Sequence, residues 1–101
     1  MSKLPWFVQK YEEYDPKYFS LIKETVEEAM NPKSLDDKTK YLILLALDVA
    51  KGAAAGIRVL ARQARAAGAT EGEIREVLRL VYFVNSIGAV RNGLYAYDES
   101  N

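Results

Sequence analysis

The segment from Asp37 to Lys51 constrains the fold most, because it is apolar on almost every side of the helix that its pattern predicts. Its apolar positions are Leu42, Ile43, Leu44, Leu45, Ala46, Leu47, Val49 and Ala50. A helix that is hydrophobic all round has to be buried all round. In a chain of 101 residues, this requirement places the helix at the centre of the domain or shares it with another copy of the chain.

Start and stop signals predict helices on both sides of this segment. Asp15-Pro16 supplies an N-cap acceptor and a proline at the first helical position, and Asn31-Pro32 ends the helix that follows. Gly52 interrupts the chain after the apolar helix, and Gly68 closes a further helix over residues 53–67 at its C′ position. The run from Thr70 to Glu73 is a capping box that opens the next helix.

Helices are also predicted at the two ends of the chain. Pro5 opens a short helix within an N-terminal segment of residues 1–14. Asn85-Ser86 and Gly88 predict a break or a kink, after which a final helix runs to about Tyr97. No strand pattern is present. The sequence therefore predicts an all-α fold of about five to six helices in one domain over residues 1–101.

The absence of cysteine and histidine narrows the chemistry more than any other feature of composition. Without cysteine there is no disulfide, thiolate metal site or thiol nucleophile. Without histidine the commonest general base and metal ligand are missing. We therefore expect no cofactor and no metal. Lysine and arginine together equal aspartate and glutamate at 14 each, so no net charge directs the chain toward nucleic acid or a membrane.

No targeting segment is visible in the sequence. The longest apolar run, Tyr41–Leu47, is far too short to span a bilayer. We expect a cytoplasmic protein.

Residues 34–84 carry an ordered set of motifs. Leu35, Asp36, Lys38 and Thr39 come first, then Gly52 and Ile57, and finally Gly68, Ala69, Thr70, Glu73, Ile74, Glu76 and Leu78. In order and spacing this stretch resembles the core of the carboxymuconolactone decarboxylase / AhpD-like family, with its K-T-x-E-L-I, G-C-x-x-C-I-x-x-H and A-G-A-T-x-x-E-I elements. The resemblance implies a compact helical protomer that assembles as a trimer or a hexamer.

This sequence differs from that family at the positions where the family carries its catalytic residues. The proton-relay glutamate falls at Tyr41, the two cysteines at Ala53 and Gly56, and the histidine at Leu60. None of these residues supplies a thiolate, so peroxide reduction of the AhpD type is excluded. The sequence predicts a non-catalytic, homo-oligomeric module that serves as an assembly or scaffold subunit.

Two origins of the fourfold replacement remain open. A natural lineage has lost catalysis and kept its oligomer, or the chain was engineered from a family member as a building block. The small, helix-favouring residues at Ala53, Ala54 and Ala55, together with Ala66 and Ala67, favour the engineered origin without deciding between the two.

The alanine-rich helix also predicts a contact surface. Ala55, Val59 and Ala66 leave one helix face small and flat, and Arg62 lies beside it. With Leu42 and Leu45 of the apolar helix, these residues are the candidate interface. The expected partners are further copies of the chain and, in a larger symmetric assembly, a second protein chain.

Other clusters have a functional and a structural interpretation. Lys51, Arg58, Arg62 and Arg65 form a basic stretch that suits an anion, although a solvated helix face explains it as well. Glu24, Glu27 and Glu28 suit a hard cation or a charged exterior. Aromatic residues could line a pocket or serve as packing anchors, and we favour packing. They are Trp6, Phe7, Tyr11, Tyr14, Tyr18, Phe19, Tyr82, Phe83, Tyr95 and Tyr97.

Asp48 is the remaining candidate for chemistry, because it is the one carboxylate inside the most apolar helix. We favour a structural role, in an ion pair across a subunit boundary or at a wet edge of the helix. The alternative function is an enzyme acting on a small carboxylated or lactone substrate, and it would rely on Tyr41, Asp48 and arginines.

Overall fold

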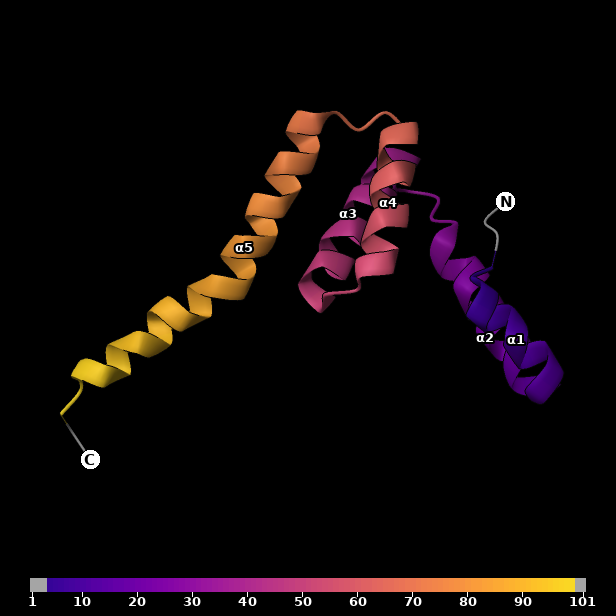
Figure 1. Cartoon of the computed structure of the whole chain (residues 1–101), viewed down its shortest axis with the longest axis horizontal. Coiled ribbons are helices and arrows are strands. Elements are labelled where there is room, and N and C mark those ends of the chain that lie inside the picture. Colours follow the sequence, from indigo (N-terminus) through magenta and orange to yellow (C-terminus); the bar gives the residue numbers. More distant parts are fainter. Residues whose placement is uncertain (1–3, 100–101) are drawn as a thin grey trace. The chain divides into compact units, whose positions relative to one another are not determined.

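The computed structural model describes residues 4–99, and every regular element among them is helical (Figure 1). The all-α prediction is therefore confirmed. The chain divides into two compact units, one ending at Asp36 and the other beginning at Asp37. The single domain over residues 1–101 stays a prediction. The elements are α1 (Trp6–Tyr14), α2 (Pro16–Met30), α3 (Asp37–Lys51), α4 (Ala54–Ala66), α5 (Glu71–Gly93) and the 3-10 helix η1 (Leu94–Tyr97).

The first unit is the antiparallel pair α1 and α2, joined at a single residue. Asp15 ends α1, and its side-chain Oδ1 accepts a hydrogen bond of 3.1 Å from the backbone N–H of Tyr18 at the start of α2. Pro16 occupies the first helical position, as the sequence predicts. Val8 and Phe19 are buried between the two helices.

The second unit begins with the hairpin of α3 and α4, which lie side by side (Figure 1). Gly52 turns the chain at a φ of 77°, a left-handed conformation that favours glycine. The backbone N–H of Ala53 donates to the carbonyl oxygen of Asp48 at 3.1 Å, which closes the turn. The predicted interruption at Gly52 is confirmed.

The connection from α4 to α5 is fixed by caps at both helix ends. Gly68 has a φ of 102° after the last turn of α4, and the next N–H, from Ala69, donates to the carbonyl oxygen of Ala64 at 2.9 Å. Thr70 then forms the predicted capping box with Glu73. Both cap predictions are confirmed.

The core of this second unit is small. Leu45 of α3, with 1% of its surface exposed, packs with Ala64 of α4, with Ala69 in the connection and with Ile74 of α5. Partly buried side chains surround this cluster, and they come from α3, α4 and α5: Tyr41, Leu42, Val49, Ile57, Leu60, Ala61 and Val77.

Of the break or kink predicted at Asn85-Ser86 and Gly88, the break is wrong, because α5 is one continuous helix from Glu71 to Gly93. Asparagine, serine and glycine cost only about 0.5–1 kcal/mol each inside a helix relative to alanine. Good helix formers and β-branched residues surround them, and the backbone hydrogen bonds continue through this part of α5. A weak local preference therefore does not stop the helix.

Helix α3 is also less buried than its composition predicts. Ile43 is 44% exposed and Leu47 is 56% exposed, although Leu45 between them is buried. The described elements cover the side of α3 that faces α4 and α5. Its opposite side keeps apolar surface that elements of this unit do not cover.

We predict that Glu73→Gln destabilises the chain at neutral pH but not at low pH. The Glu73 carboxylate accepts a 2.8 Å hydrogen bond from the backbone N–H of Thr70 and a 3.0 Å bond from Lys38 Nζ. These bonds, the backbone bond first, hold the pKa of Glu73 below its usual value. When the pKa of a carboxyl group is lower in the folded state than in the unfolded state, the charged group stabilises the fold at every pH above the unfolded-state pKa. This contribution is lost as the pH falls through the folded-state pKa.

Thermal unfolding of both proteins between pH 7 and pH 3 tests this prediction. The melting temperature of wild type should exceed that of Glu73→Gln at neutral pH, and the gap should close on acidification. Glu76→Gln, at an exposed position of the same helix, is the control. A gap that does not change with pH would contradict the role of the carboxylate.

Candidate functional site

The four positions at which the resembled family places its chemistry lie on one hairpin. Tyr41 is on α3, Ala53 is the N-cap of α4, and Gly56 and Leu60 are on α4. A Cβ atom added at Gly56 would lie 3.9 Å from the Cβ of Ala53. This separation falls within the range that a disulfide spans. The backbone therefore keeps the geometry of a cysteine pair, although neither position carries sulfur.

Asp48 occupies the space where a side chain at position 56 would lie. The added Cβ would collide with the Asp48 carboxylate oxygen and would approach its Cγ to 3.3 Å. Asp48 itself is half-buried at the end of α3. Residue 56 must therefore be glycine while Asp48 keeps this conformation.

This placement also gives Asp48 a structural role. Gly56 lies in the first turn of α4, so the carboxylate rests against the N-terminal end of that helix. The helix dipole stabilises negative charge at that end. The sequence analysis did not identify this contact. The available signal was a glycine inside an alanine-rich helix, where it costs about 1 kcal/mol and needs a reason to be there.

The other two family positions have become packing residues. Tyr41 and Leu60 both pack against the core cluster around Leu45. Lys40 Nζ lies 4.5 Å from the centre of the Tyr41 ring. Tyr41 and Asp48 share a face of α3 but are seven residues apart, which is about 10 Å along a helix. The buried Leu45 lies between them, so the two polar groups do not form an acid–base pair.

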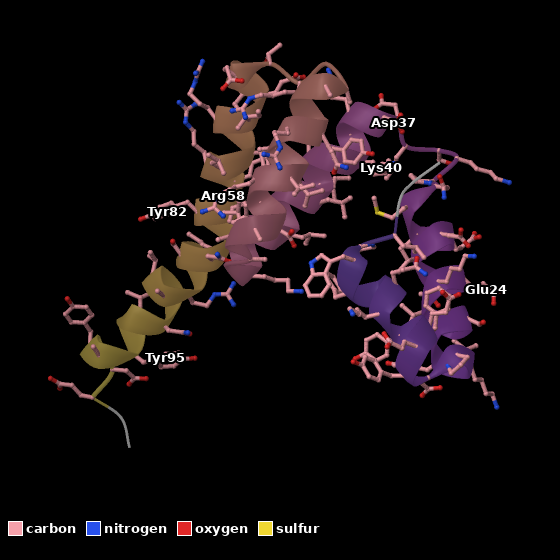
Figure 2. The ribbon with its side chains drawn as sticks, turned by 45° about the vertical axis from the view of Figure 1, so that its right-hand side comes forward. Glu24, Asp37, Lys40, Arg58, Tyr82 and Tyr95 are labelled. Atoms are coloured by element: carbon pink, nitrogen blue, oxygen red, sulfur yellow. The ribbon has the colours of Figure 1, made fainter. Side chains whose placement is uncertain are left out.

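The basic stretch on α4 is partly neutralised by an acid that follows it. The Arg65 guanidinium donates two hydrogen bonds to the Glu71 carboxylate, at 2.7 and 2.9 Å. This bidentate pair raises the pKa of Arg65 and lowers the pKa of Glu71. Arg58, labelled in Figure 2, and Arg62 are exposed. The pairing favours the interpretation of a solvated helix face over that of an anion site.

The glutamate cluster of α2 lines a shallow hollow of about 620 Å³ together with other polar residues. They are Glu24, Glu27, Glu28, Asn31, Pro32 and Lys33. Lys33 brings a positive charge to the same hollow. In residues 4–99, no group of three or more histidine, cysteine, aspartate or glutamate side chains is placed to hold one metal ion. The cluster gives no support for a cation site.

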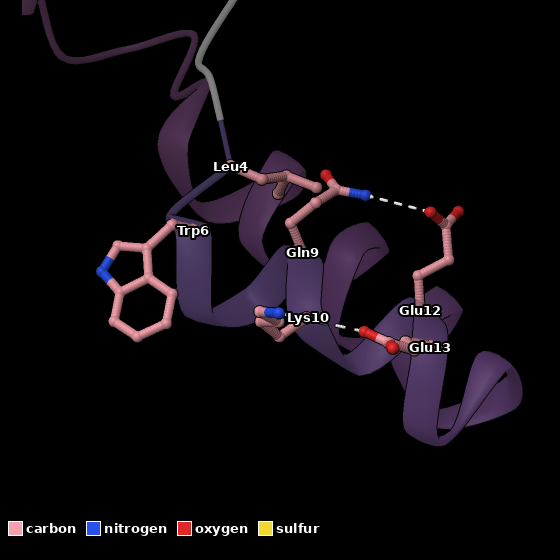
Figure 3. A pocket seen from close by; sticks show the side chains of 6 residues that line it. All are labelled: Leu4, Trp6, Gln9, Lys10, Glu12 and Glu13. Atoms are coloured by element: carbon pink, nitrogen blue, oxygen red, sulfur yellow. Dashed lines mark hydrogen bonds and ion pairs between the residues drawn. The ribbon is translucent and has the colours of Figure 1, made fainter.

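A hollow of about 750 Å³ lies along α1 and involves one of the candidate aromatic residues, Trp6 (Figure 3). Its polar side chains pair with one another. Gln9 donates to Glu12 at 3.2 Å, and Lys10 lies 3.9 Å from Glu13. Because these groups satisfy each other along one helix face, they do not converge on a bound molecule.

A narrower groove lies between α3 and α5. It has a volume of about 190 Å³ and an almost entirely apolar lining, made by Ala46, Leu47, Ala50, Leu80, Val81, Val84 and Asn85. The sequence analysis did not anticipate it, because it depends on which faces of two distant helices meet.

The candidate interface residues divide into two groups. Ala55, Val59, Arg62 and Ala66 are exposed on α4, so another chain can reach them. Leu42 and Leu45 instead face the core of their own unit, and Leu45 is only 1% exposed. Of the candidate interface residues, those on α4 are therefore the exposed ones.

Comparison with known proteins gives one match. A family model described as the carboxymuconolactone decarboxylase family matches residues 16–99, which run from the start of α2 to beyond η1. No curated protein and no solved structure matches the chain. Within the described residues, no helix combines the length and hydropathy that crossing a membrane requires.

The contact between Asp48 and Gly56 leads to a double-mutant prediction. Gly56→Ala should lower the free energy of unfolding by about 1–3 kcal/mol, because the added methyl group overpacks against the carboxylate. In an Asp48→Ala background the same change should raise it by up to about 1 kcal/mol, since alanine is the better helix former.

Urea unfolding of the four proteins measures this coupling. If Gly56→Ala has the same effect in both backgrounds, Asp48 does not fill the space beside residue 56.

Proposed function

The chain belongs to the carboxymuconolactone decarboxylase family, and we propose that it serves as a non-catalytic, homo-oligomeric assembly subunit. The proposal rests on the fate of the family's chemical positions. The hairpin that would present a cysteine pair is retained, whereas its space is taken by Asp48 and its neighbours Tyr41 and Leu60 pack into the core.

The chain has no functional group for the thiol chemistry of the family. Peroxide reduction needs a thiolate to attack and a second thiol to release the product, and the chain contains no cysteine. A carboxylate in the place of the second thiol cannot perform either step. Tyr41 and Leu60 pack against the core and help to shape the hairpin. This packing supports a structural role for the chain.

The balance between burial and exposure supports assembly. In the second unit the buried hydrophobic residues are Leu45, Ala64, Ala69 and Ile74, and two of these four are alanines. Burying a leucine contributes about 1.5–3 kcal/mol, whereas ordering each residue costs about 1–2 kcal/mol. So small a core needs further apolar burial, and contact between copies would provide it.

The exposed face of α4 gives this subunit a second contact surface. Ala55, Val59, Arg62 and Ala66 lie on it, and small side chains allow another helix to approach closely. We propose that the family oligomer of three or six chains forms through other surfaces. The α4 face would then join such oligomers, or bind a second protein chain, in a larger symmetric assembly.

A second candidate function follows from the carboxylate beside the former thiol position. Asp48 could transfer a proton to or from a small carboxylated or lactone substrate, with an arginine holding the substrate carboxylate. The buried Leu45 between Asp48 and Tyr41 weighs against this candidate. Turnover of such a substrate that is abolished by Asp48→Asn or Tyr41→Phe would favour it over the assembly role.

Light scattering coupled to size exclusion tests the assembly role directly. We expect wild type to have the mass of three or six chains, or of a larger symmetric particle. Val59→Glu with Ala66→Lys should reduce any larger particle to three or six chains, because it places charges on the α4 face. Arg75→Glu, an exposed charge change on α5, is the control. A single-chain mass at every concentration would contradict the proposal.

A further inference from the structure

Helix α4 carries three positive charges and no acid of its own. Arg58, Arg62 and Arg65 follow one another at spacings of four and three residues, so they line one edge of the helix. We call these three residues the arginine edge. No aspartate or glutamate occurs between Asp48 and Glu71. A carboxylate that pairs with this edge therefore has to come from outside α4.

One member of the arginine edge shows which group satisfies it. Arg65 binds the carboxylate of Glu71 at the start of the next helix, through hydrogen bonds of 2.7 and 2.9 Å. Arg58 and Arg62 are exposed, and no carboxylate among residues 4–99 pairs with either of them. Two guanidinium groups of the arginine edge are therefore available to a carboxylate of another molecule.

Beside the arginine edge, α4 exposes small apolar side chains. They are Ala55, Val59 and Ala66, and Val59 is 43% exposed. The opposite side of the helix faces the core, where Ala64 is fully buried. Small side chains let the backbone of a second helix come close, and larger side chains of that helix can then rest between them. This face of α4 therefore offers apolar contact and positive charge together.

We infer that this face of α4 binds an amphipathic helix of a different protein, which carries large apolar side chains along one stripe and two carboxylates, four residues apart, beside it. The inference rests on the proposed function, because it names the second protein chain that the α4 face would bind. Paired helices meet through apolar side chains at the centre of the contact and through charges at its edges. Carboxylates four residues apart match Arg58 and Arg62, since positions at this spacing lie on the same side of a helix.

The charge of this face favours a different protein over a second copy of α4. A second α4 would bring arginines and no carboxylate, so the two arginine edges would repel each other. Its small apolar side chains would also meet alanines and a single valine, which leaves little apolar area to bury. A helix with carboxylates gains attraction where a copy meets repulsion, and such repulsion is a common means of rejecting a wrong partner.

A nucleic acid would use only part of the same face. Its phosphates could pair with Arg58 and Arg62. The apolar side chains beside them would stay uncovered, and α4 has no aromatic residue on which a base could stack. The combination of charge and apolar contact therefore favours a protein helix.

Binding of a synthetic peptide tests the inference. The probe has three heptads, with leucine at positions a and d and glutamate at positions e and g, and its control has glutamine in place of glutamate. In fluorescence anisotropy with dye-labelled peptides, wild type should bind the glutamate peptide, and it should bind the glutamine peptide about tenfold more weakly.

Reversing the charge of the arginine edge should reverse this preference. Arg58→Glu with Arg62→Glu should weaken binding of the glutamate peptide by about tenfold or more, and it should favour a peptide with lysine at positions e and g. Arg79→Glu, at an exposed position of α5, is the control and should leave these affinities nearly unchanged. If the double variant loses helical circular dichroism, Arg58→Gln with Arg62→Gln takes its place.

Three results would overturn the inference. The first is equal affinity of wild type for the glutamate and glutamine peptides, or no binding at millimolar peptide. The second is unchanged binding of the glutamate peptide after the charge reversal. The third is a short DNA duplex that displaces the labelled peptide at a lower concentration than unlabelled peptide does, which would show a nucleic-acid surface instead.

Light scattering separates this inference from the proposed function. Without peptide, Arg58→Glu with Arg62→Glu should keep the mass of wild type. A lower mass would show that the arginine edge joins copies of the chain, which overturns the inference and leaves the assembly role standing. A single-chain mass for wild type at every concentration overturns the assembly role, whereas the peptide affinities still decide whether α4 binds an acidic helix.

Discussion

The burial of Leu45 is the interaction on which the second half of the molecule depends. This one side chain of α3 meets Ala64 of α4, Ala69 in the connection and Ile74 of α5. Two of these three contacts are alanines, so the backbones approach closely around a single large residue. Because the caps at Gly52, Gly68 and Thr70 set the ends of the helices, a small cluster is enough to position all three.

The same packing explains how a catalytic frame can persist without its chemistry. The hairpin geometry is set by Leu45 and by the turn at Gly52, neither of which is a chemical position of the family. Positions 53 and 56 therefore have the spacing of a cysteine pair although neither carries sulfur. The Asp48 carboxylate rests against the N-terminal end of α4, and in this conformation it leaves no room for a side chain at position 56.

So small a core also leaves apolar side chains of this unit exposed. The exposed side of α3, the groove beside it and the exposed apolar side chains of α5 belong to one unit and lie next to one another. We propose that contact between copies covers this surface, in which case assembly and folding would be coupled.

The sequence by itself determined the helices and their ends, because caps, prolines and left-handed glycines act within a few residues of where they stand. Asp15, Gly52, Gly68 and the capping box at Thr70 were all predicted from such local signals. The family frame followed from the same spacings. The tertiary structure decided the rest. In the tertiary structure, α5 continues through Asn85-Ser86 and one side of α3 stays exposed. The Asp48 carboxylate also lies against Gly56. These outcomes depend on which faces of distant helices meet, and packing between residues far apart in the chain overrides or adds to local preference.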